Sequence, residues 1–391
     1  MDLQYSQEYE EFRTEVAAFL SRCWQAPEKG RPSADSIKRF RNVAIEAGYL
    51  YRSVPKVYGG SESDPDVLKA QIIRDEFERV RAPREIASVG VDMLVPTLLE
   101  KGEDWQKEKF IRRTIEGDCV WCQGYSEPGS GSDLASVSTK AVLDGDGWRI
   151  NGQKIWTSYA HKADYMFILV RTEPDKPKHE GISYLLLDMH QPGVEVRPLK
   201  QITGGSTFNE VFFDDAITPA DWIVGERGQG WAVSRTTLKH ERNWIGGAGK
   251  SVALFDKLVE LAGRSKRFGR PALEDPEICD RLAQLEGLIL AHKFSGHRQL
   301  TAGAKGVEPG LIGLMNKLMT TKINHDVANI VIELLGEAAM QAPMGGAGER
   351  ASGDSKWLNQ YYGSLGFSIA GGTSNIQRNI IAERGLGLPR E

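Results

Sequence analysis

Two short stretches of the chain combine residue types that could hold a flat polar ring. The stretch from Gly124 to Asp133, called here the Gly/Ser loop, packs glycines, serines and one proline so densely that it can form neither a helix nor a central strand. Its backbone N–H groups and hydroxyls therefore stay available as hydrogen-bond donors. The stretch from Gln153 to Ser158 places the indole face of Trp156 beside the hydroxyl of Thr157. Together they predict half of a cofactor site, in which the loop binds the ring edge and the indole covers its face.

These stretches resemble the first signature of the acyl-CoA dehydrogenase family, in Ser126-Glu127 and in the Gly-Ser-Asp run that ends at Asp133. The Trp-x-Ser/Thr element of that family is matched by Trp156 to Ser158. In the family both elements hold the isoalloxazine of FAD, whereas a Gly/Ser loop on its own is usually a surface turn. The resemblance implies flavin contacts at Tyr125, Ser126, Gly131, Ser132, Trp156, Thr157 and Ser158, and a substrate contact at Ser132 as well.

The closing stretch from Gly372 to Arg384 resembles the second signature of the family. It implies FAD contacts at Gly372, Thr373 and Asn375, although Gln is more usual than Asn at the last position.

A third element, Phe268-Gly269, resembles the Arg-x-x-Phe-Gly motif that holds the FAD pyrophosphate of a neighbouring subunit. Ser265 stands where the motif has its arginine, and the charged contact could come instead from its neighbours Arg264, Lys266 or Arg267. Of these, Arg267 beside Phe268 is taken as the candidate contact. A second departure is Glu337, which stands where the family usually has a Gly-Gly pair. A carboxylate there would repel a pyrophosphate unless it turned away or paired.

The resemblance implies α,β-dehydrogenation of an acyl-CoA thioester, which needs a carboxylate to take the α-proton while the β-hydrogen leaves as hydride. Many members carry this base immediately before the Gly-Thr-Ser of the second signature, where this chain has Gly371. The isovaleryl- and long-chain-type branches instead place a Glu before an Arg on a long helix, which matches Glu241 and Arg242. We therefore expect Glu241 to be the base, Arg242 to support CoA, and the N–H of Gly371 to bind the thioester oxygen. The alternative is that both charged side chains are solvated on the helix surface.

The predicted secondary structure that positions these residues is helical first, then β, then helical again. Residues 1–118 predict a helical domain, with an apolar stripe from Phe12 to Cys23 and an N-cap at Ser33. Further helical patterns cover Asp66 to Val80, Ile86 to Leu99 and Glu103 to Ile115.

Residues 119–225 predict a small antiparallel β-barrel or sandwich, with a type I′ hairpin turn at Asn151-Gly152. The predicted strands are Thr139 to Leu143, Trp148 to Ile150, Tyr165 to Arg171, Ile182 to Leu187, Val194 to Pro198 and Phe208 to Phe213.

Residues 226–391 predict a four-helix-like bundle, opening with one helix of about 50 Å from Trp231 to Arg264. Further helices are expected across Asp275 to Thr301, Leu311 to Met340 and Ser374 to Arg384. The α+β order of helices, β-domain and bundle resembles the architecture of the same family over the full chain.

Net charge, the N-terminal residues and the cysteines bear on other possible functions and on the location of the protein. The 391 residues carry a net charge of −4 without a run of like charges, which excludes the electrostatic footprint of nucleic-acid or anionic-membrane binding. Met1 to Gln4 lacks a basic or apolar leader, so a cytoplasmic location is expected. Cys119 and Cys122 have redox spacing but no second pair, so we predict two buried thiols and no metal site.

The leading hypothesis is an FAD-dependent acyl-CoA dehydrogenase of acyl-CoA catabolism that passes electrons to an electron-transfer flavoprotein. A homotetramer or a heterotetramer is implied by the resemblance. One alternative is a weakly catalytic or non-catalytic partner subunit of a mixed tetramer, suggested by Ser265, Glu337 and Gly371. Another is a flavin oxidase or monooxygenase on the same fold. The sequence leaves the acyl group open among branched, aromatic-derived and ring-bearing chains.

Overall fold

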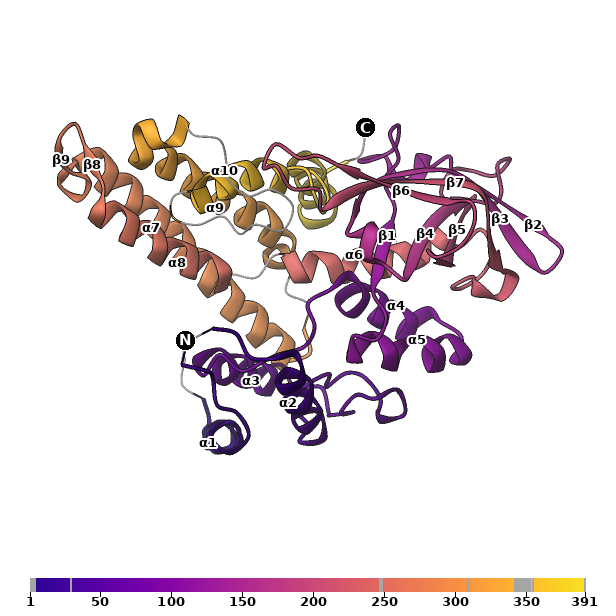
Figure 1. Cartoon of the computed structure of the whole chain (residues 1–391). Helices are drawn as coiled ribbons and strands as arrows, with labels where there is room; N and C mark the ends of the chain where they lie inside the picture. Colours follow the sequence, from indigo (N-terminus) through magenta and orange to yellow (C-terminus); the bar gives the residue numbers. More distant parts are fainter. Residues whose placement is uncertain are drawn as a thin grey trace.

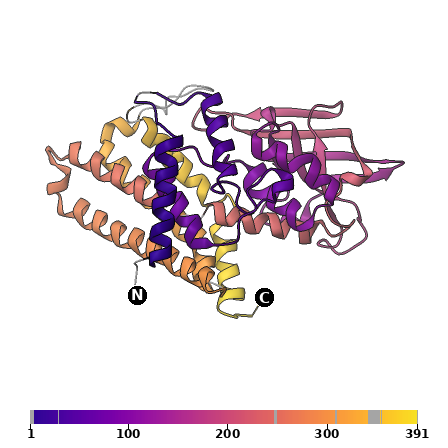
Figure 2. The same cartoon turned by 90° about the horizontal axis from the view of Figure 1, so that it is seen from below.

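A computed structural model of the chain describes residues 5–28, 30–245, 249–307, 310–340, 353 and 355–389 (Figure 1). Within α6 and α7, the side chains of residues 241–245 and 249–250 lie outside this description. In Figure 1 the sheet lies to the right, the long C-terminal helices extend to the left, and the N-terminal helices lie along the lower side, the side that Figure 2 views.

The N-terminal part is helical, as predicted. Its elements are α1 (Gln7–Cys23), α2 (Ala34–Glu46), η1 (Lys56–Tyr58), α3 (Val67–Arg79), the π-helical turn η2 (Gly90–Leu94), α4 (Val95–Lys101) and α5 (Asp104–Glu116). Ser33 caps α2 as expected, because its hydroxyl accepts from the Ser36 N–H at 3.2 Å. Two details differ from the predictions. Cys23 ends α1 and is exposed, and the helix predicted from Ile86 starts at Gly90 because the Ile86 N–H donates to the Tyr51 hydroxyl.

The middle part forms one curled sheet. Its strands are β1 (Trp121–Gly124), β2 (Lys140–Asp144), β3 (Gly147–Ser158), β4 (Tyr165–Arg171), β5 (Ile182–Asp188), β6 (Val194–Leu199) and β7 (Phe208–Pro219). The order is β1-β4-β2-β3-β7-β6, with β5 paired to β4. Most pairs are antiparallel, as expected, but β4 runs parallel to β1 and to β2. A buried apolar cluster that includes Trp148, Ile168 and Leu185 fills its interior.

The predicted hairpin turn at Asn151-Gly152 is wrong. β3 runs through both residues, and the chain reverses at Asp144 to Gly147. The Asn151 side chain instead bonds Asp215 on β7, and the β3–β7 register shifts between Ile150 and Gly152. Gly152 has φ +147°, and a Cβ there would lie 2.7 Å from the Thr139 hydroxyl. The Asn-Gly pair therefore marks a strand irregularity where only glycine fits.

The C-terminal part is a helical bundle, as predicted. It contains α6 (Gly230–Ile245), α7 (Gly249–Arg264), the hairpin of β8 (Lys266–Arg267) and β9 (Arg270–Pro271), α8 (Pro276–Ala304), α9 (Leu311–Leu335), η7 (Gly336–Met340), α10 (Ser355–Phe367), α11 (Ser374–Ile380) and the π-helical turn η8 (Ile381–Gly385). The predicted 50 Å helix corresponds to α6 and α7, and residues 246–248 between them lie outside the described ranges. Helix α10 is absent from the predictions, and it packs on α9. Leu258, Ile278 and Val327 belong to the core shared by α7, α8 and α9.

Helix α6 links the parts of the molecule. It contacts β5 of the sheet and both η2 and α4 of the N-terminal helices (Figure 1). Within this contact the hydroxyls of Thr97 on α4 and Thr237 on α6 lie 2.9 Å apart, fully buried. Position 241 on α6 thus lies one helical turn beyond an anchored contact.

A candidate cofactor site between the Gly/Ser loop and strand β3

The structure brings the Gly/Ser loop and the end of β3 together. The backbone N–H of Ile155 donates to the carbonyl oxygen of Ser126 at 2.9 Å. One residue earlier, the Lys154 ammonium donates to the carbonyl oxygen of Tyr125 at 3.1 Å. The two stretches that the sequence singled out are therefore one structural unit.

A bulge in β3 turns Trp156 outward. The β3–β7 register shifts between Lys154 and Thr157, and Trp156 adopts φ +61°. Its side chain is 60% exposed and meets Phe208 edge to face, with ring centroids 6.3 Å apart. A left-handed conformation costs about 1–3 kcal/mol for a bulky residue and concentrates at functional sites. The bulge therefore presents an indole face that the fold itself leaves uncovered.

Three hydroxyls at this junction are open. Thr157 Oγ1 is buried without a hydrogen-bond partner. Within the described ranges, no hydrogen bond takes up the hydroxyl of Ser126 or Ser158, or the Ser126 N–H. A buried hydroxyl without a partner costs about 1–3 kcal/mol. A flat ring with polar edge atoms would satisfy these groups, so the residues present fit the isoalloxazine of FAD.

The glycines of the loop leave its outer side open. A Cβ on Gly129 or Gly131 would meet no atom within 4 Å, and Ser132 is exposed. The Tyr125 side chain points the other way, into the core, where its ring meets Phe167 and Tyr184 edge to face. Only the backbone of Tyr125 is therefore placed to serve its predicted flavin contact.

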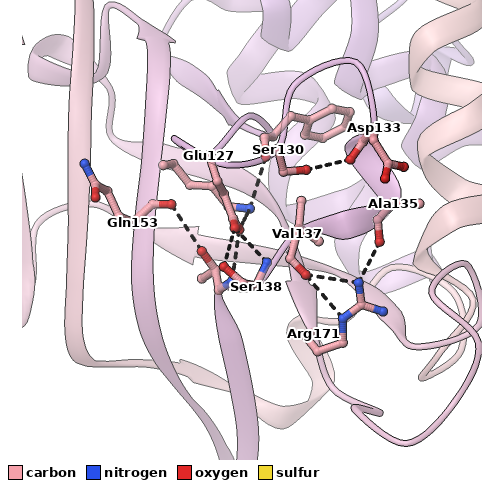
Figure 3. A network of polar contacts seen from close by, with 11 residues as sticks. Glu127, Ser130, Asp133, Ala135, Val137, Ser138, Gln153 and Arg171 are labelled. Carbon is pink, nitrogen blue, oxygen red and sulfur yellow. Dashed lines mark hydrogen bonds and ion pairs between the residues drawn. The ribbon is translucent and has the colours of Figure 1, made fainter.

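A buried ion pair supports the loop from behind, and the sequence interpretation missed its role. Lys154 Nζ lies 2.7 Å from Glu127 Oε1, and the two side chains are 0% and 5% exposed. Glu127 also accepts from the Ser138 N–H at 2.6 Å, the Ser138 hydroxyl and the Thr139 N–H (Figure 3). The available signal was the two-residue alternation of β3, which puts Lys154 on the same inward face as Trp148 and Ile150.

This pair carries opposed electrostatic effects. Burial acts to raise the pKa of Glu127, but the Lys154 charge and the surrounding donors outweigh it and hold that pKa at about 2. For Lys154, burial lowers the pKa to about 8, although the charge and hydrogen bond of Glu127 act to raise it. The geometry favours the ionised pair at neutral pH, since the carboxylate is met by four donors.

A second cation fixes the segment that follows the Gly/Ser loop. The Arg171 guanidinium donates to the carbonyl oxygens of Ala135 at 2.6 Å and Val137 at 3.0 Å (Figure 3). On the outside, Lys178 pairs with Asp133 at 2.8 Å. The loop is therefore held at both ends, while Ser126 between them stays open.

The second signature lies at the start of α11, which packs on α9. Gly371 and Gly372 have φ +64° and +87°, and the Gln377 amide donates to the Gly371 carbonyl at 3.2 Å. The Thr373 hydroxyl caps α11, and Asn375 accepts from Arg378. In the part of the chain described, no hydrogen bond joins this segment to the Gly/Ser loop. Its flavin and thioester contacts stay predictions.

The expected base lies in α6. Glu241 and Arg242 belong to this helix, and their side chains are outside the described ones. The preceding residue, His240, lies 3.1 Å through Nε2 from Glu100 Oε1 on α4. The roles of Glu241 and Arg242 stay predictions.

The residues expected to reach a neighbouring subunit lie in the β8–β9 hairpin. Arg267 is bound by carboxylates of its own chain, Asp275 at 2.9 Å, Glu277 at 2.8 Å and Glu333 at 3.7 Å. Phe268 is 88% exposed at φ +52°. The aromatic ring is thus free to contact a partner, whereas the guanidinium is already surrounded by negative charge.

The two thiols of the Cys119–Cys122 pair are buried, as expected. Cys119 and Cys122 are buried and unpaired, and burial raises the pKa of both thiols. Among the described residues, no group of three or more His, Cys, Asp or Glu could hold a metal ion. None of the described helices has the length and apolar content needed to cross a bilayer.

Three family models match the chain end to end. They are the N-terminal domain of acyl-CoA dehydrogenase over residues 6–118, the middle domain over 122–216 and the C-terminal domain over 228–386. The chain is 37% identical over 399 residues to acyl-CoA dehydrogenase IpdE1 of Mycobacterium tuberculosis, covering 98% of this chain and 99% of that one.

Solved structures agree with this assignment. The Tcur3481-Tcur3483 steroid ACAD superposes with a TM-score of 0.77 at 28% identity, covering 100% of both chains. The ChsE4-ChsE5 complex from Mycobacterium tuberculosis gives a TM-score of 0.77 at 27% identity, again over 100% of both chains. With matched models over all three parts and a relative of this identity, the chain belongs to the acyl-CoA dehydrogenase family of flavin-dependent oxidoreductases.

Proposed function

We propose that the protein binds FAD between the Gly/Ser loop and the end of β3 and dehydrogenates an acyl-CoA thioester to the trans-2-enoyl-CoA. The observation that carries this proposal is the cluster of open hydroxyls, led by the buried Thr157 Oγ1, beside the strained and exposed Trp156. Ser126, Thr157, Ser158 and Trp156 would hold the ring, together with Gly131, Ser132 and the backbone of Tyr125. When bound, FAD supplies the acceptor for the hydride from the β-carbon.

The protein supplies the proton chemistry. The Glu241 carboxylate would take the α-proton, and Arg242 would support CoA. The position of the base in other branches of the family is taken here by Gly371, whose φ of +64° suits glycine. Because it has no side chain, it would not compete with a carboxylate from α6. The N–H of Gly371 would donate to the thioester oxygen, where negative charge develops as the proton leaves.

The proposal also covers the acyl group of the substrate, the electron acceptor and the assembly of the protein. The description of one structural neighbour as a steroid ACAD supports a ring-bearing acyl group. An electron-transfer flavoprotein would reoxidise the flavin, a tetramer would complete the site, and the cytoplasm remains the expected location.

The proposal is tested by anaerobic bleaching of the flavin with a panel of acyl-CoA thioesters. The panel contains straight-chain, branched, aryl and steroid-derived acyl groups. We expect loss of flavin absorbance with the ring-bearing thioesters and formation of the enoyl-CoA in equal amount. Protein that binds FAD but bleaches with none of them would contradict the dehydrogenase. Rapid reoxidation by oxygen would favour the oxidase or monooxygenase alternative.

A second candidate is a partner subunit in a mixed tetramer, and the Arg267 cluster favours it. Because Asp275, Glu277 and Glu333 already surround Arg267, the guanidinium is poorly placed to take up another chain's pyrophosphate. Ser265 offers no substitute, since its hydroxyl donates to the Leu261 carbonyl at 2.8 Å. The ChsE4-ChsE5 complex is a precedent for two different chains of this fold in one assembly. Purified protein that is colourless alone and becomes yellow only with a second chain would favour this candidate.

A further inference from the structure

The peptide group between Tyr125 and Ser126 is bound on one side and open on the other. Its carbonyl oxygen accepts from the buried Lys154 ammonium at 3.1 Å. Its N–H, on Ser126, makes no hydrogen bond within the described ranges. The next carbonyl, that of Ser126, accepts from the Ile155 N–H. The peptide groups on both sides of Ser126 are therefore held, which fixes the direction of the Ser126 N–H.

A cation on a peptide oxygen strengthens the N–H of the same peptide. The ammonium draws electron density from the amide, and cooperative strengthening of about 10–30% per bond is expected in a low-dielectric interior. Here the cation is 0% exposed, so water does not screen it. Glu127 holds it in place and is itself fixed by Ser138 and Thr139.

Stability alone gives a weak reason for such a pair. Replacing a buried ion pair with neutral groups of similar volume is often neutral or stabilising, because desolvation offsets the attraction. Lys154 also occupies the last paired position before the register shift that turns Trp156 outward. The ammonium therefore acts at two points of the candidate site, the Ser126 donor and the base of the bulge.

We propose that Lys154 is a positioning residue that strengthens the Ser126 N–H as a donor to bound FAD and thereby raises the reduction potential of the flavin. The inference rests on the proposed function, because it places FAD at this loop. The two-electron reduced flavin is the more electron-rich form, so a stronger donor at its edge stabilises that form more than the oxidised one.

The test compares Lys154→Met/Glu127→Gln with Arg171→Met. The double variant removes the donor on the Tyr125 carbonyl without leaving a buried charge. The control removes a half-buried cation that bonds two carbonyls just beyond the Gly/Ser loop, those of Ala135 and Val137, but not this peptide. We expect the double variant to shift the flavin potential to more negative values and to weaken FAD binding about fivefold, as for one hydrogen bond. Arg171→Met should lower the melting temperature without moving the potential.

The outcomes separate this inference from the proposed function. Wild-type protein that binds no FAD overturns both. Wild-type protein that binds FAD and oxidises acyl-CoA, with equal potentials in wild type and double variant, overturns the role of Lys154 alone. A shift of the same size in Arg171→Met overturns it too, since the effect would then be general loosening of the loop.

If the double variant does not fold, the pH dependence of the flavin potential in the wild type tests the same proposal. Lys154 faces two charged groups, Glu127 and Arg171, and burial lowers its pKa to about 8. Loss of its proton above this pH weakens the donor. The flavin potential should then fall below the straight line that it follows at lower pH. Arg171→Met should keep this break but move it to higher pH, because the Arg171 charge acts to lower the pKa of Lys154. A straight line through pH 8 in both proteins contradicts the proposal.

Discussion

The backbone N–H of Ile155 donates to the carbonyl oxygen of Ser126 at 2.9 Å. This bond lies directly before Trp156, at the bulge of β3, and directly after Tyr125, whose carbonyl Lys154 holds. The Gly/Ser loop and the bulge are therefore tied by one backbone bond and one side-chain bond on consecutive residues of each segment. A substitution in either segment should affect the other, which makes the junction suited to tests that separate function from folding.

Trp156→Gly should leave folding nearly intact and weaken FAD binding. Release of the left-handed strain at φ +61° offsets the greater entropy of an unfolded glycine, so the unfolding free energy of the FAD-free protein should change by less than about 1 kcal/mol. Loss of the indole face should weaken FAD binding roughly tenfold. Tyr159→Gly is the matched control, because Tyr159 is also exposed at φ +55° on the same segment. Equal FAD affinities in the two variants would remove Trp156 from the site.

Glu127→Gln should destabilise the protein less at acid pH than at pH 7. The folded-state pKa of about 2 lies below the ordinary value of 4.5, so Glu127 contributes stability above pH 4.5 that is lost as the pH falls toward 2. The shift corresponds to about 3 kcal/mol. Urea unfolding between pH 3 and 7 should show the difference between wild type and variant shrinking as pH falls. The exposed Glu274→Gln serves as control, and a difference that does not change with pH would contradict the buried ion pair.

The sequence predicted most helices and strands correctly, but it did not predict local irregularities within them. Periodicity located the helices and strands because burial of one face depends on residues three and four apart, or two apart, in the chain. Asn151-Gly152 carries the residue types of a hairpin turn, yet Thr139 and Asp215, which decide its conformation, come from other strands. Such contacts between distant segments are invisible to a local pattern.

The same limit applies to the site. Residue types alone indicated that the loop and Trp156 belong together, and the Ile155 to Ser126 bond confirms that they meet. Lys154 was missed because a lysine in a strand is usually solvated, and only the fold reveals that it is fully buried against Glu127. Arg267 was expected to bind a partner's pyrophosphate because its ion pairs could not be foreseen. Two of the carboxylates that pair with it come from α8 and α9, which are distant in the sequence or belong to another element.

Freeing Arg267 should strengthen FAD binding by the protein alone. In Glu277→Gln/Glu333→Gln the guanidinium loses two of its three carboxylate neighbours and becomes available to a pyrophosphate. We expect FAD affinity to rise about fivefold at low salt, with less gain at high salt because exposed charges are screened. Glu274→Gln, on the same connection but without an ion pair to Arg267, should leave affinity unchanged. No gain in the double variant would show that this hairpin lies away from the cofactor.

Glu241→Gln should abolish dehydrogenation while the protein stays yellow. Loss of a general base lowers the rate about 100- to 10,000-fold, whereas the amide keeps the size of the side chain and leaves FAD and product binding in place. The measurements are the rate of anaerobic flavin bleaching and the exchange of the substrate's α-proton with deuterium from solvent, which should both be lost. Glu260→Gln, an exposed change on α7, is the control and should retain both. Exchange that persists in Glu241→Gln would assign the proton to another group, and an equal loss in Glu260→Gln would point to damage of the bundle.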